Sequence, residues 1–380
     1  MTTNHGPRTT DVAIVGGGII GLALGWRLAE RGRTVTVLER DRAGRGASWA
    51  AGGMLASAAE VQFEEAEIYR FGRESLRRWP AFARDLEAAS GQAVGYREEG
   101  TLVVADDRDA AEALQRLYRF QQAHEVPVTW LTAREALEIE PFLSPKLAAA
   151  VFSPEDHQVD NRAVVEALRT VLINHPSATL REGVAVRAVA PGERSAAVTE
   201  DGERVEARVV VLAAGAWSRG IEGLEPVPVR PLKGQMLALR MELPFALRHV
   251  VRGPDAYLVP KADGRLVIGA TSEEMGFDTA VTGGGLYRLL EGAVEVVPGV
   301  EELAFVEAWA GLRPASRDHA PLLGPSGAPG VVLATGHYRH GILFTPLTAD
   351  ELALEIDARL GDRDETSDWL APFSPLRLGA

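Results

Sequence analysis

The chain has 380 residues, of which 46% are hydrophobic and 24% are charged, so it is long and apolar enough to fold around a sizeable core. A formal net charge of −13 argues against nucleic acid as a partner, because binding to phosphates needs clustered positive charge. The sequence contains no cysteine, which excludes disulfides, cysteine-ligated zinc, iron–sulfur clusters and any cofactor tethered through a thiol.

The start of the chain predicts neither secretion nor membrane insertion. Residues 1–10 hold no apolar core and no cleavage pattern, and we expect a tail before the first strand. The longest apolar run, residues 209–217, is much shorter than the roughly 20 residues that a membrane helix needs. We therefore expect a cytoplasmic protein that does not bind a membrane.

The first part of the chain predicts a β–α–β unit. Residues 11–15 form a short apolar run that ends in glycines, as a buried parallel strand does. Residues 19–31 place apolar side chains at helical spacing, and Gly32 is suited to end that helix. Residues 34–38 are rich in β-branched side chains and predict the second strand.

The rest of the chain mixes two kinds of pattern. Further helices are expected at residues 75–89, 110–124 and about 341–360. Apolar strands that end in small residues, like the first strand, are expected at 208–215 and 330–334. Short strands separated by turn residues favour an antiparallel sheet, and they are expected at 100–105, 235–240, 256–260 and 266–270.

These patterns predict an α/β protein (α+β overall) whose two domains are interleaved in sequence. One is a Rossmann-like dinucleotide-binding domain, for which we expect residues 1–85, 146–225 and 305–380. The other is a substrate-binding domain built on the antiparallel sheet, for which we expect residues 86–145 and 226–304.

The turn after the first strand satisfies the pattern G-x-G-x-x-G with Gly16, Gly18 and Gly21. Gly16 permits the tight turn, Gly18 lets the backbone approach a pyrophosphate, and Gly21 lets the helix pack on the strand. The start of the helix offers unpaired N–H groups to phosphate. Glu39 follows the second strand and is placed to accept hydrogen bonds from a ribose, which disfavours the 2′-phosphate of NADP.

The next loop, residues 45–54 (RGASWAAGGM), consists mostly of very small side chains. Small side chains over such a length predict a close approach of the backbone to a large planar ligand. The glycine pattern alone does not distinguish FAD from NAD, and this loop favours FAD.

Four segments occur in order over nearly the whole chain: DVAIVGGGIIGLALGWRLAERGRTVTVLER, GASWAAGGML, WAGLRPASRDHAPLLGP and GVVLATGHYRHGILFTP. They resemble the FAD-dependent amine oxidoreductases of the D-amino-acid oxidase superfamily, most closely the glycine oxidase branch linked to thiamine biosynthesis. The resemblance implies non-covalent FAD and oxidative deamination of glycine, by way of an imine, to glyoxylate and ammonia. Oxygen is then the acceptor and gives hydrogen peroxide. It also implies a homotetramer and a thiazole synthase partner that consumes the imine.

The resemblance implies roles for single residues. Besides the three glycines, the positions that contact FAD match Ile19, Ile20, Glu39, Arg40, Ala47, Ser48, Gly52, Gly53, Met54, Val186, His337, Tyr338, Arg339, His340, Gly341, Ile342 and Leu343. The positions that bind substrate match Arg313, Arg339 and Tyr257. No catalytic acid–base side chain is implied, because a hydride passes directly to the flavin. Two departures are His340, where glycine oxidases commonly carry asparagine, and Trp49, which replaces a small residue.

Arg313 also makes chemical sense without the resemblance. A guanidinium holds a substrate carboxylate with two parallel hydrogen bonds, and Pro314 restricts the backbone before it to extended conformations. Arginine is abundant in this chain, so a surface ion pair remains the alternative for Arg313 and Arg339. For Tyr257 the alternative is a strand aromatic that packs on the sheet.

Three further expectations concern cationic groups and the last helix. His337 and His340 are three residues apart, but no cluster of carboxylates accompanies them, so we expect cofactor contact and no metal site. A helix that starts near Gly341 would direct its N-terminus at the flavin. Lys233 and Lys261, two of only three lysines, are expected to be exposed.

Other functions stay open on the sequence alone. A flavin oxidase or dehydrogenase of sarcosine, a D-amino acid or a proline-like imino acid would share the fold, FAD and Arg313. A flavin-binding protein that hands imine to thiazole synthase would form a stable complex and release little peroxide. A nucleotide-binding module without flavin would purify colourless.

Overall fold

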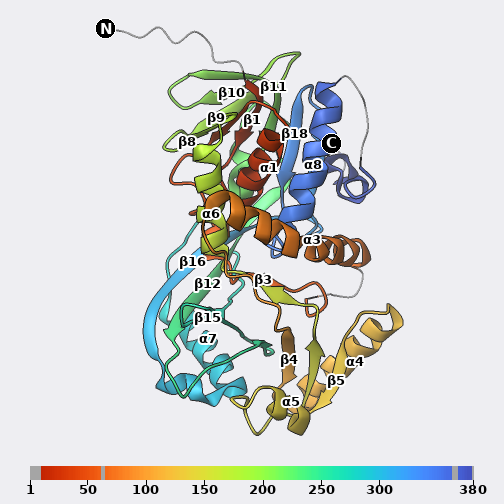
Figure 1. The fold of residues 1–380 in the computed structure, drawn as a ribbon, viewed down its shortest axis with the longest axis vertical. Coiled ribbons are helices and arrows are strands. Elements are labelled where there is room, and N and C mark those ends of the chain that lie inside the picture. The colour runs from red at the N-terminus through yellow and green to blue at the C-terminus, as the bar shows by residue number, and fades with distance from the viewer. Residues whose placement is uncertain (1–9, 61–64, 362–366, 379–380) are drawn as a thin grey trace.

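The computed structural model describes residues 10–60, 65–361 and 367–378. Residues 1–9, for which the sequence predicts a tail, lie outside the described residues. Figure 1 shows an upper lobe around one sheet and a lower lobe around a second sheet, with the long strands β12 (Val229–Arg240) and β16 (Ala304–Ser316) running between them. Within the described ranges each of these two sheets has eight strands, which confirms the predicted combination of α/β and antiparallel architecture.

The upper sheet contains the predicted β–α–β unit. β1 (Thr10–Val15) pairs in parallel with β2 (Val35–Leu38) on one side and with β11 (Arg204–Leu212) on the other. The parallel part is completed by β8 (Ala178–Arg181) and β18 (Val331–Thr335). Three antiparallel strands extend it: β17 (Leu322–Pro325) pairs with β18, β10 (Ser195–Thr199) pairs with β11, and β9 (Val186–Ala190) pairs with β10.

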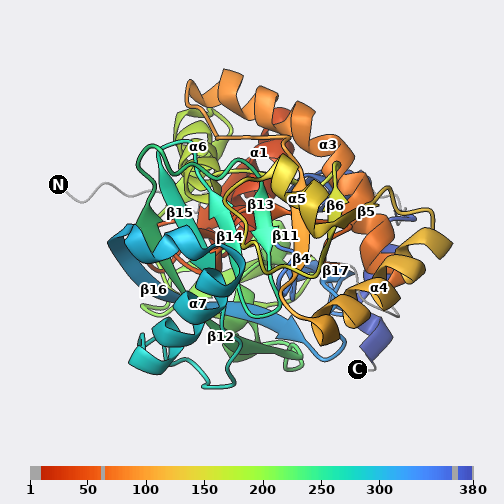
Figure 2. The ribbon, with the colours of Figure 1, turned by 90° about the horizontal axis from the view of Figure 1, so that it is seen from below.

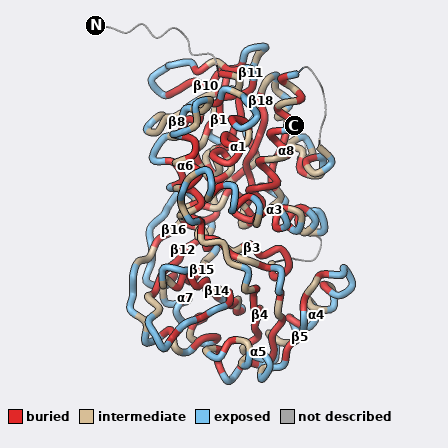
Figure 3. Tube along the Cα trace, in the orientation of Figure 1, coloured by how far each residue is buried: buried red, intermediate tan, exposed pale blue. Residues whose placement is uncertain are grey.

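Helices cover the upper sheet and bury its apolar residues, as Figure 3 shows by the buried segments at the centre of this lobe. α1 (Ile19–Glu30) packs against α6 (Asn161–Asn174) and α8 (Thr345–Leu360), and α3 (Ala66–Ser90) crosses below them. The indole of Trp26 meets the ring of Phe82 edge-on at 5.5 Å, which ties α1 to α3. No helix of the described ranges is long and apolar enough to cross a membrane.

The lower sheet has the order β16-β12-β15-β14-β13-β4-β6-β5 and is antiparallel except between β13 and β4. Its remaining strands are β4 (Thr101–Ala105), β5 (Thr129–Thr132), β6 (Ala149–Ser153), β13 (Val250–Arg252), β14 (Tyr257–Pro260) and β15 (Arg265–Gly269). Figure 2 shows α7 (Gly283–Val296) and α4 (Arg108–Ala123) at opposite ends of this sheet, with α5 (Ala133–Ile139) between them.

Short elements connect the two lobes and complete the chain. The loop at residues 45–54 contains α2 (Ala47–Ala50), and β3 (Met54–Leu55) pairs with β7 (His157–Gln158). Single 3₁₀ turns lie at Gly215–Gly220, Pro298–Glu302, Ala371–Phe373 and Pro375–Leu378.

Three details of the predicted elements differ from the structure. The last helix begins at Thr345 rather than near Gly341, because Pro346, which has no N–H to donate, suits its first turn. The helix predicted over residues 75–89 begins nine residues earlier, because α3 spans Ala66–Ser90.

The third difference concerns the lower sheet. β6 and the whole of β16 pair in it, although residues 146–225 and 305–380 are predicted to belong with the upper one. Both strands are apolar, and a local pattern does not reveal which distant strand is the partner. The division into two domains remains our proposal, now with these two strands in the second domain.

Candidate active site

A cavity of about 1290 Å³ lies between the two lobes, at the carboxyl ends of β1 and β2. Its walls come from the glycine-rich turn, the loop at residues 45–54, the start of β9, strands β12 and β15, and the turn that follows β18. Dinucleotides bind outside the carboxyl ends of parallel strands in folds of this kind. The predicted cofactor and substrate residues all line this cavity except Gly21, His340 and Leu343.

The glycine-rich turn has the geometry that a pyrophosphate requires. Gly16 has a φ of +110°, and a Cβ there would lie 2.4 Å from the carbonyl oxygen of Ala213. A Cβ on Gly21 would lie 2.1 Å from the carbonyl oxygen of Gly16, so Gly21 serves helix packing rather than ligand contact. The N–H groups of Gly18 and Ile20 face no acceptor among the described residues, and both residues line the cavity. These free donors at the start of α1 fit a bound phosphate.

The small-residue loop is held from behind. The side-chain amide of Asn161 donates to the carbonyls of Ser48 and Trp49, at 2.8 and 3.1 Å. The indole N–H of Trp309 donates to Ala50, at 2.9 Å. The ammonium of Lys261 donates to Gly52, at 2.8 Å. The loop therefore turns these carbonyls away from the cavity.

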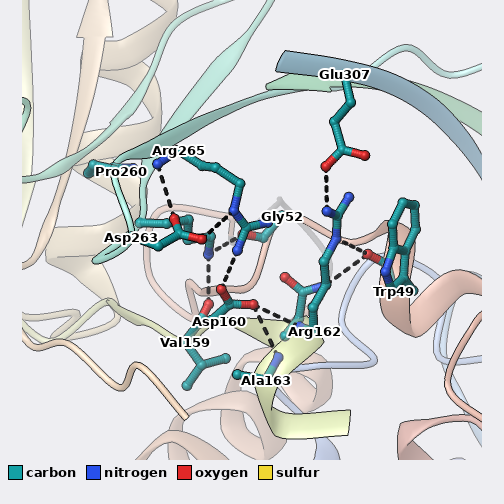
Figure 4. Close-up of polar contacts among 12 residues, drawn as sticks. Trp49, Gly52, Val159, Asp160, Arg162, Ala163, Pro260, Asp263, Arg265 and Glu307 are labelled. Atoms are coloured by element: carbon teal, nitrogen blue, oxygen red, sulfur yellow. Dashed lines mark hydrogen bonds and ion pairs between the residues drawn. The ribbon is translucent and has the colours of Figure 1, made fainter. Parts of the chain in front are cut away.

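Trp49, which departs from the resemblance, does not line the cavity. Its ring meets that of Trp309 at 5.7 Å, and the guanidinium of Arg162 lies 3.6 Å from its ring centroid. Figure 4 shows Arg162 between Trp49 and Glu307, to which it is ion-paired at 2.5 Å. The large side chain therefore braces the loop from outside without changing the cavity wall.

Arg313 and Tyr257 form one end of the cavity. Arg313, on β16, donates from Nη1 to the carbonyl of Thr271 at 3.0 Å and has no carboxylate partner among the described residues. Its guanidinium lies over Gly234, where a Cβ would come within 2.6 Å of it. Burial raises the pKa of Tyr257 and outweighs the nearby Arg313, which acts in the opposite direction, so the phenol stays protonated and can donate.

The ring of Tyr257 is held between two further glycines. A Cβ would come within 2.9 Å of the ring at Gly52 and within 2.6 Å at Gly269. Glycine backbone therefore lies directly against the side chains of Arg313 and Tyr257.

Two other guanidiniums at this end are neutralised. Arg252 pairs with Glu60 at 3.3 Å and donates to the carbonyl of Ala59 at 3.0 Å. Arg339, predicted to bind substrate, pairs with Glu65 at 2.6 Å. Arg339 lines the cavity, but its charge is already compensated, which distinguishes it from Arg313. Sequence reasoning missed Glu60 and Arg252, because neither lies in a motif.

The residues predicted to contact the cofactor after β18 do not all lie at the cavity. His337 lines the cavity, and burial lowers its pKa to about 3, so the ring is neutral. His340 lies off the main cavity and stacks on Phe344 at 5.0 Å, and burial lowers its pKa as well. Gly341 and Ile342 line the cavity and their N–H groups donate to no described residue, so the turn before α8 offers donors even though the helix starts later.

The prediction that Lys233 and Lys261 are exposed is wrong. Lys233 is fully buried and its ammonium pairs with Asp278 at 2.8 Å. Lys261 is 4% exposed and lies between two backbone carbonyls. Exposure is the usual state of lysine, and only the packing of distant segments around these two side chains reverses it.

The comparisons with known proteins agree with this geometry. The profile of the FAD dependent oxidoreductase family, DAO, matches residues 11–354. The glycine oxidase of Geobacillus kaustophilus is 37% identical, over 97% of each chain. Its crystal structure superimposes with a TM-score of 0.89, at 36% identity, and covers 97% of this chain and 99% of that one.

A second relative has a different length. The bifunctional protein ThiO/ThiG of Synechocystis sp. is 37% identical over 97% of this chain, which spans 54% of that longer protein. The fold, the free donors at the glycine-rich turn and the family profile lead to one assignment. The chain belongs to the DAO family of FAD-dependent oxidoreductases.

Proposed function

We propose that this protein oxidises glycine, in the presence of oxygen and water, to glyoxylate, ammonia and hydrogen peroxide. The observation that carries the proposal is Arg313, the guanidinium at the substrate end that has no carboxylate partner among the described residues. An amino acid brings one carboxylate, and a guanidinium binds it with two charge-assisted hydrogen bonds. The similarity to glycine oxidases supports the choice of a small amino acid.

The residues of the chain contribute binding and orientation. Arg313 would hold the carboxylate, and the protonated phenol of Tyr257 would donate to the same group. Glu60 and Glu65 neutralise Arg252 and Arg339, so the end of the cavity does not favour a second carboxylate. FAD, when bound, would supply the redox chemistry, which is acceptance of a hydride from the substrate carbon and reoxidation by oxygen. Fixing the substrate carbon against the cofactor is the main contribution of the protein.

The cofactor site proposed here joins both lobes. The glycine-rich turn and Glu39 would hold the pyrophosphate and adenosine half, with the start of β9 at Val186 beside the adenine. The loop at residues 45–54 and the turn at Gly341 and Ile342 would surround the flavin ring. The unpaired N–H groups at the glycine-rich turn and at the turn before α8 support this assignment.

We also propose that the imine formed from glycine feeds the thiazole of thiamine in the cytoplasm. The fused ThiO/ThiG protein of Synechocystis sp. supports a thiazole synthase as partner. A homotetramer is the assembly that we propose from the family resemblance, and sedimentation analysis measures it directly.

The absorption spectrum of the purified protein under anaerobic conditions, before and after addition of glycine, tests the activity. We expect flavin bands that bleach with glycine and return with air. Bands that ignore glycine but bleach with sarcosine, proline or a D-amino acid would refute glycine as the substrate while leaving the cofactor in place.

A pair of variants tests the role of Arg313 in the same assay. Arg313→Met removes the guanidinium, and we expect the glycine concentration for half-bleaching to rise about a hundredfold, as for a lost charged hydrogen-bond partner. Arg317→Met, an exposed arginine just beyond the end of β16, is the matched control and should behave like the unaltered protein. Equal behaviour of the two variants would contradict the proposed role.

A further inference from the structure

One buried lysine holds the cavity loop from the side opposite the cavity. Lys261 follows directly after β14, the strand that begins with Tyr257. Its ammonium donates to the carbonyl of Gly52 at 2.8 Å and to that of Val159 at 2.7 Å. Its side chain thereby connects the lower sheet with the loop at residues 45–54 and with the segment just before α6.

The contact of Lys261 with the carbonyl of Gly52 also fixes the orientation of the N–H group in the same peptide bond. The bond between Gly52 and Gly53 is trans, so its C=O and N–H point in opposite directions. Lys261 holds the C=O on the outer side, and the N–H of Gly53 has no acceptor among the described residues. Gly53 lines the cavity, so this N–H is directed into it.

Both glycines are needed for the path of the loop. A Cβ on Gly52 would come within 2.9 Å of the ring of Tyr257, and one on Gly53 would come within 2.7 Å of the Lys261 ammonium. The loop therefore passes between a residue of the substrate end and the buried lysine. The N–H of Gly53 thus lies beside the place where substrate and the reactive ring of the cofactor must meet.

The charge of Lys261 is not matched by a carboxylate within ion-pair distance among the described residues. Two acids that act on its charge, Asp160 and Asp263, are ion-paired with Arg265 at 2.5 and 2.7 Å (Figure 4). Burial lowers the pKa of Lys261 to about 7, and Asp160 opposes that effect. The buried site has a low dielectric constant, and the hydrogen bonds from the charged ammonium to the two carbonyls are therefore stronger than they would be in water.

We propose that Lys261 is a positioning residue for FAD: by holding the carbonyl of Gly52 it directs the N–H of Gly53 at an acceptor on the flavin ring. Lys261 touches neither the cavity nor the substrate and acts only through this peptide. The inference rests on the family assignment and does not depend on glycine being the substrate.

Reconstitution of the apoprotein with FAD tests the proposal without turnover. Lys261→Met removes the donor and keeps most of the side-chain volume, and the FAD dissociation constant is measured by quenching of flavin fluorescence. We expect it to rise about five- to tenfold, as for the loss of one oriented hydrogen bond. We also expect the absorption maxima of the bound flavin to shift, because its ring loses a donor.

Arg265→Gln is the matched control, because it disturbs the same junction without touching the Gly52 carbonyl. It should lower thermal stability but leave the FAD dissociation constant and the spectrum unchanged. Lys261→Met with unaltered affinity and spectrum would overturn the proposal, and so would an equal loss of affinity in both variants.

A pH series separates positioning from simple stability and remains usable if the methionine variant does not fold. FAD affinity of the unaltered protein should fall severalfold as the pH rises through about 7, because the lysine loses its charge there. The charged groups that face Lys261 are Asp160, Asp263, Arg265 and Arg97. Lys261→Arg keeps a charge that does not titrate, so its affinity should be independent of pH. A slope that persists in this variant would refute the role of Lys261.

Discussion

Gly234→Ala should damage substrate binding through Arg313 although the change adds a single methyl group. The new Cβ would lie 2.6 Å from the guanidinium, and ordinary contact begins at 3.4 Å, so the guanidinium must move by about 3.4 − 2.6 = 0.8 Å. Such a shift also strains the hydrogen bond from Arg313 to the carbonyl of Thr271, now 3.0 Å long. A misplacement of about 1 Å at a reacting centre costs about a hundredfold in rate.

The assay is peroxide formation from glycine, with kcat and KM determined separately. We expect kcat/KM to fall by about a hundredfold while the FAD content and the flavin spectrum stay unchanged. Gly284→Ala is the control, because no atom lies within 4 Å of a Cβ at that position in the first turn of α7. It should match the unaltered protein in both constants.

Thermal unfolding of Gly234→Ala shows whether the sheet itself has been disturbed. Normal stability together with a normal kcat/KM would refute the reasoning. Such a result would mean that the displaced guanidinium binds substrate as well as the undisplaced one does. Loss of FAD from the variant would also contradict it, since Arg313 is assigned to the substrate and not to the cofactor.

Three further predictions concern stability and cofactor binding. Asp278→Asn leaves the buried ammonium of Lys233 without its carboxylate partner and should lower the free energy of unfolding in denaturant titrations; no change would refute the pairing. Burial raises the pKa of Asp156 from 3.8 to about 6, so the folded state binds this proton more tightly than the unfolded state, and the resulting stability is lost as the pH rises through about 6. Asp156→Asn should lack that slope between about pH 4 and 6 in the same titrations, and a slope that persists would assign it to another group. Trp217→Leu removes a cavity ring that stacks on Phe277 at 5.5 Å, and fluorescence quenching should show FAD binding weakened about threefold; unaltered affinity would show that the ring is not used.

The sequence predicted those parts of the fold and the candidate site that depend on local patterns. The β–α–β unit could be read because apolar period, glycine spacing and Glu39 all lie within a short segment. The position of Arg313 in the cavity was predicted through the resemblance of its segment, and its lack of a carboxylate partner came only from the structure.

The rest depends on contacts between distant segments. Lys261 is buried because a loop near residue 52 and a segment near residue 159 converge on it, more than 100 residues away in the sequence. The neutralisation of Arg252 by Glu60 has the same origin. Neither local periodicity nor propensity carries information about contacts between distant segments. The burial of Lys261 and the ion pair between Arg252 and Glu60 could therefore not be predicted from the sequence.

The two glutamates beside the substrate end have a consequence for how this cavity changes its preference. Arg252 and Arg339 lie at the substrate end of the cavity, and their charges are neutralised by ion pairs with Glu60 and Glu65. Exchanging one glutamate for glutamine would release a positive charge without introducing any new basic residue. A single substitution of a glutamate would therefore favour substrates with two carboxylates, and no substitution of an arginine is needed.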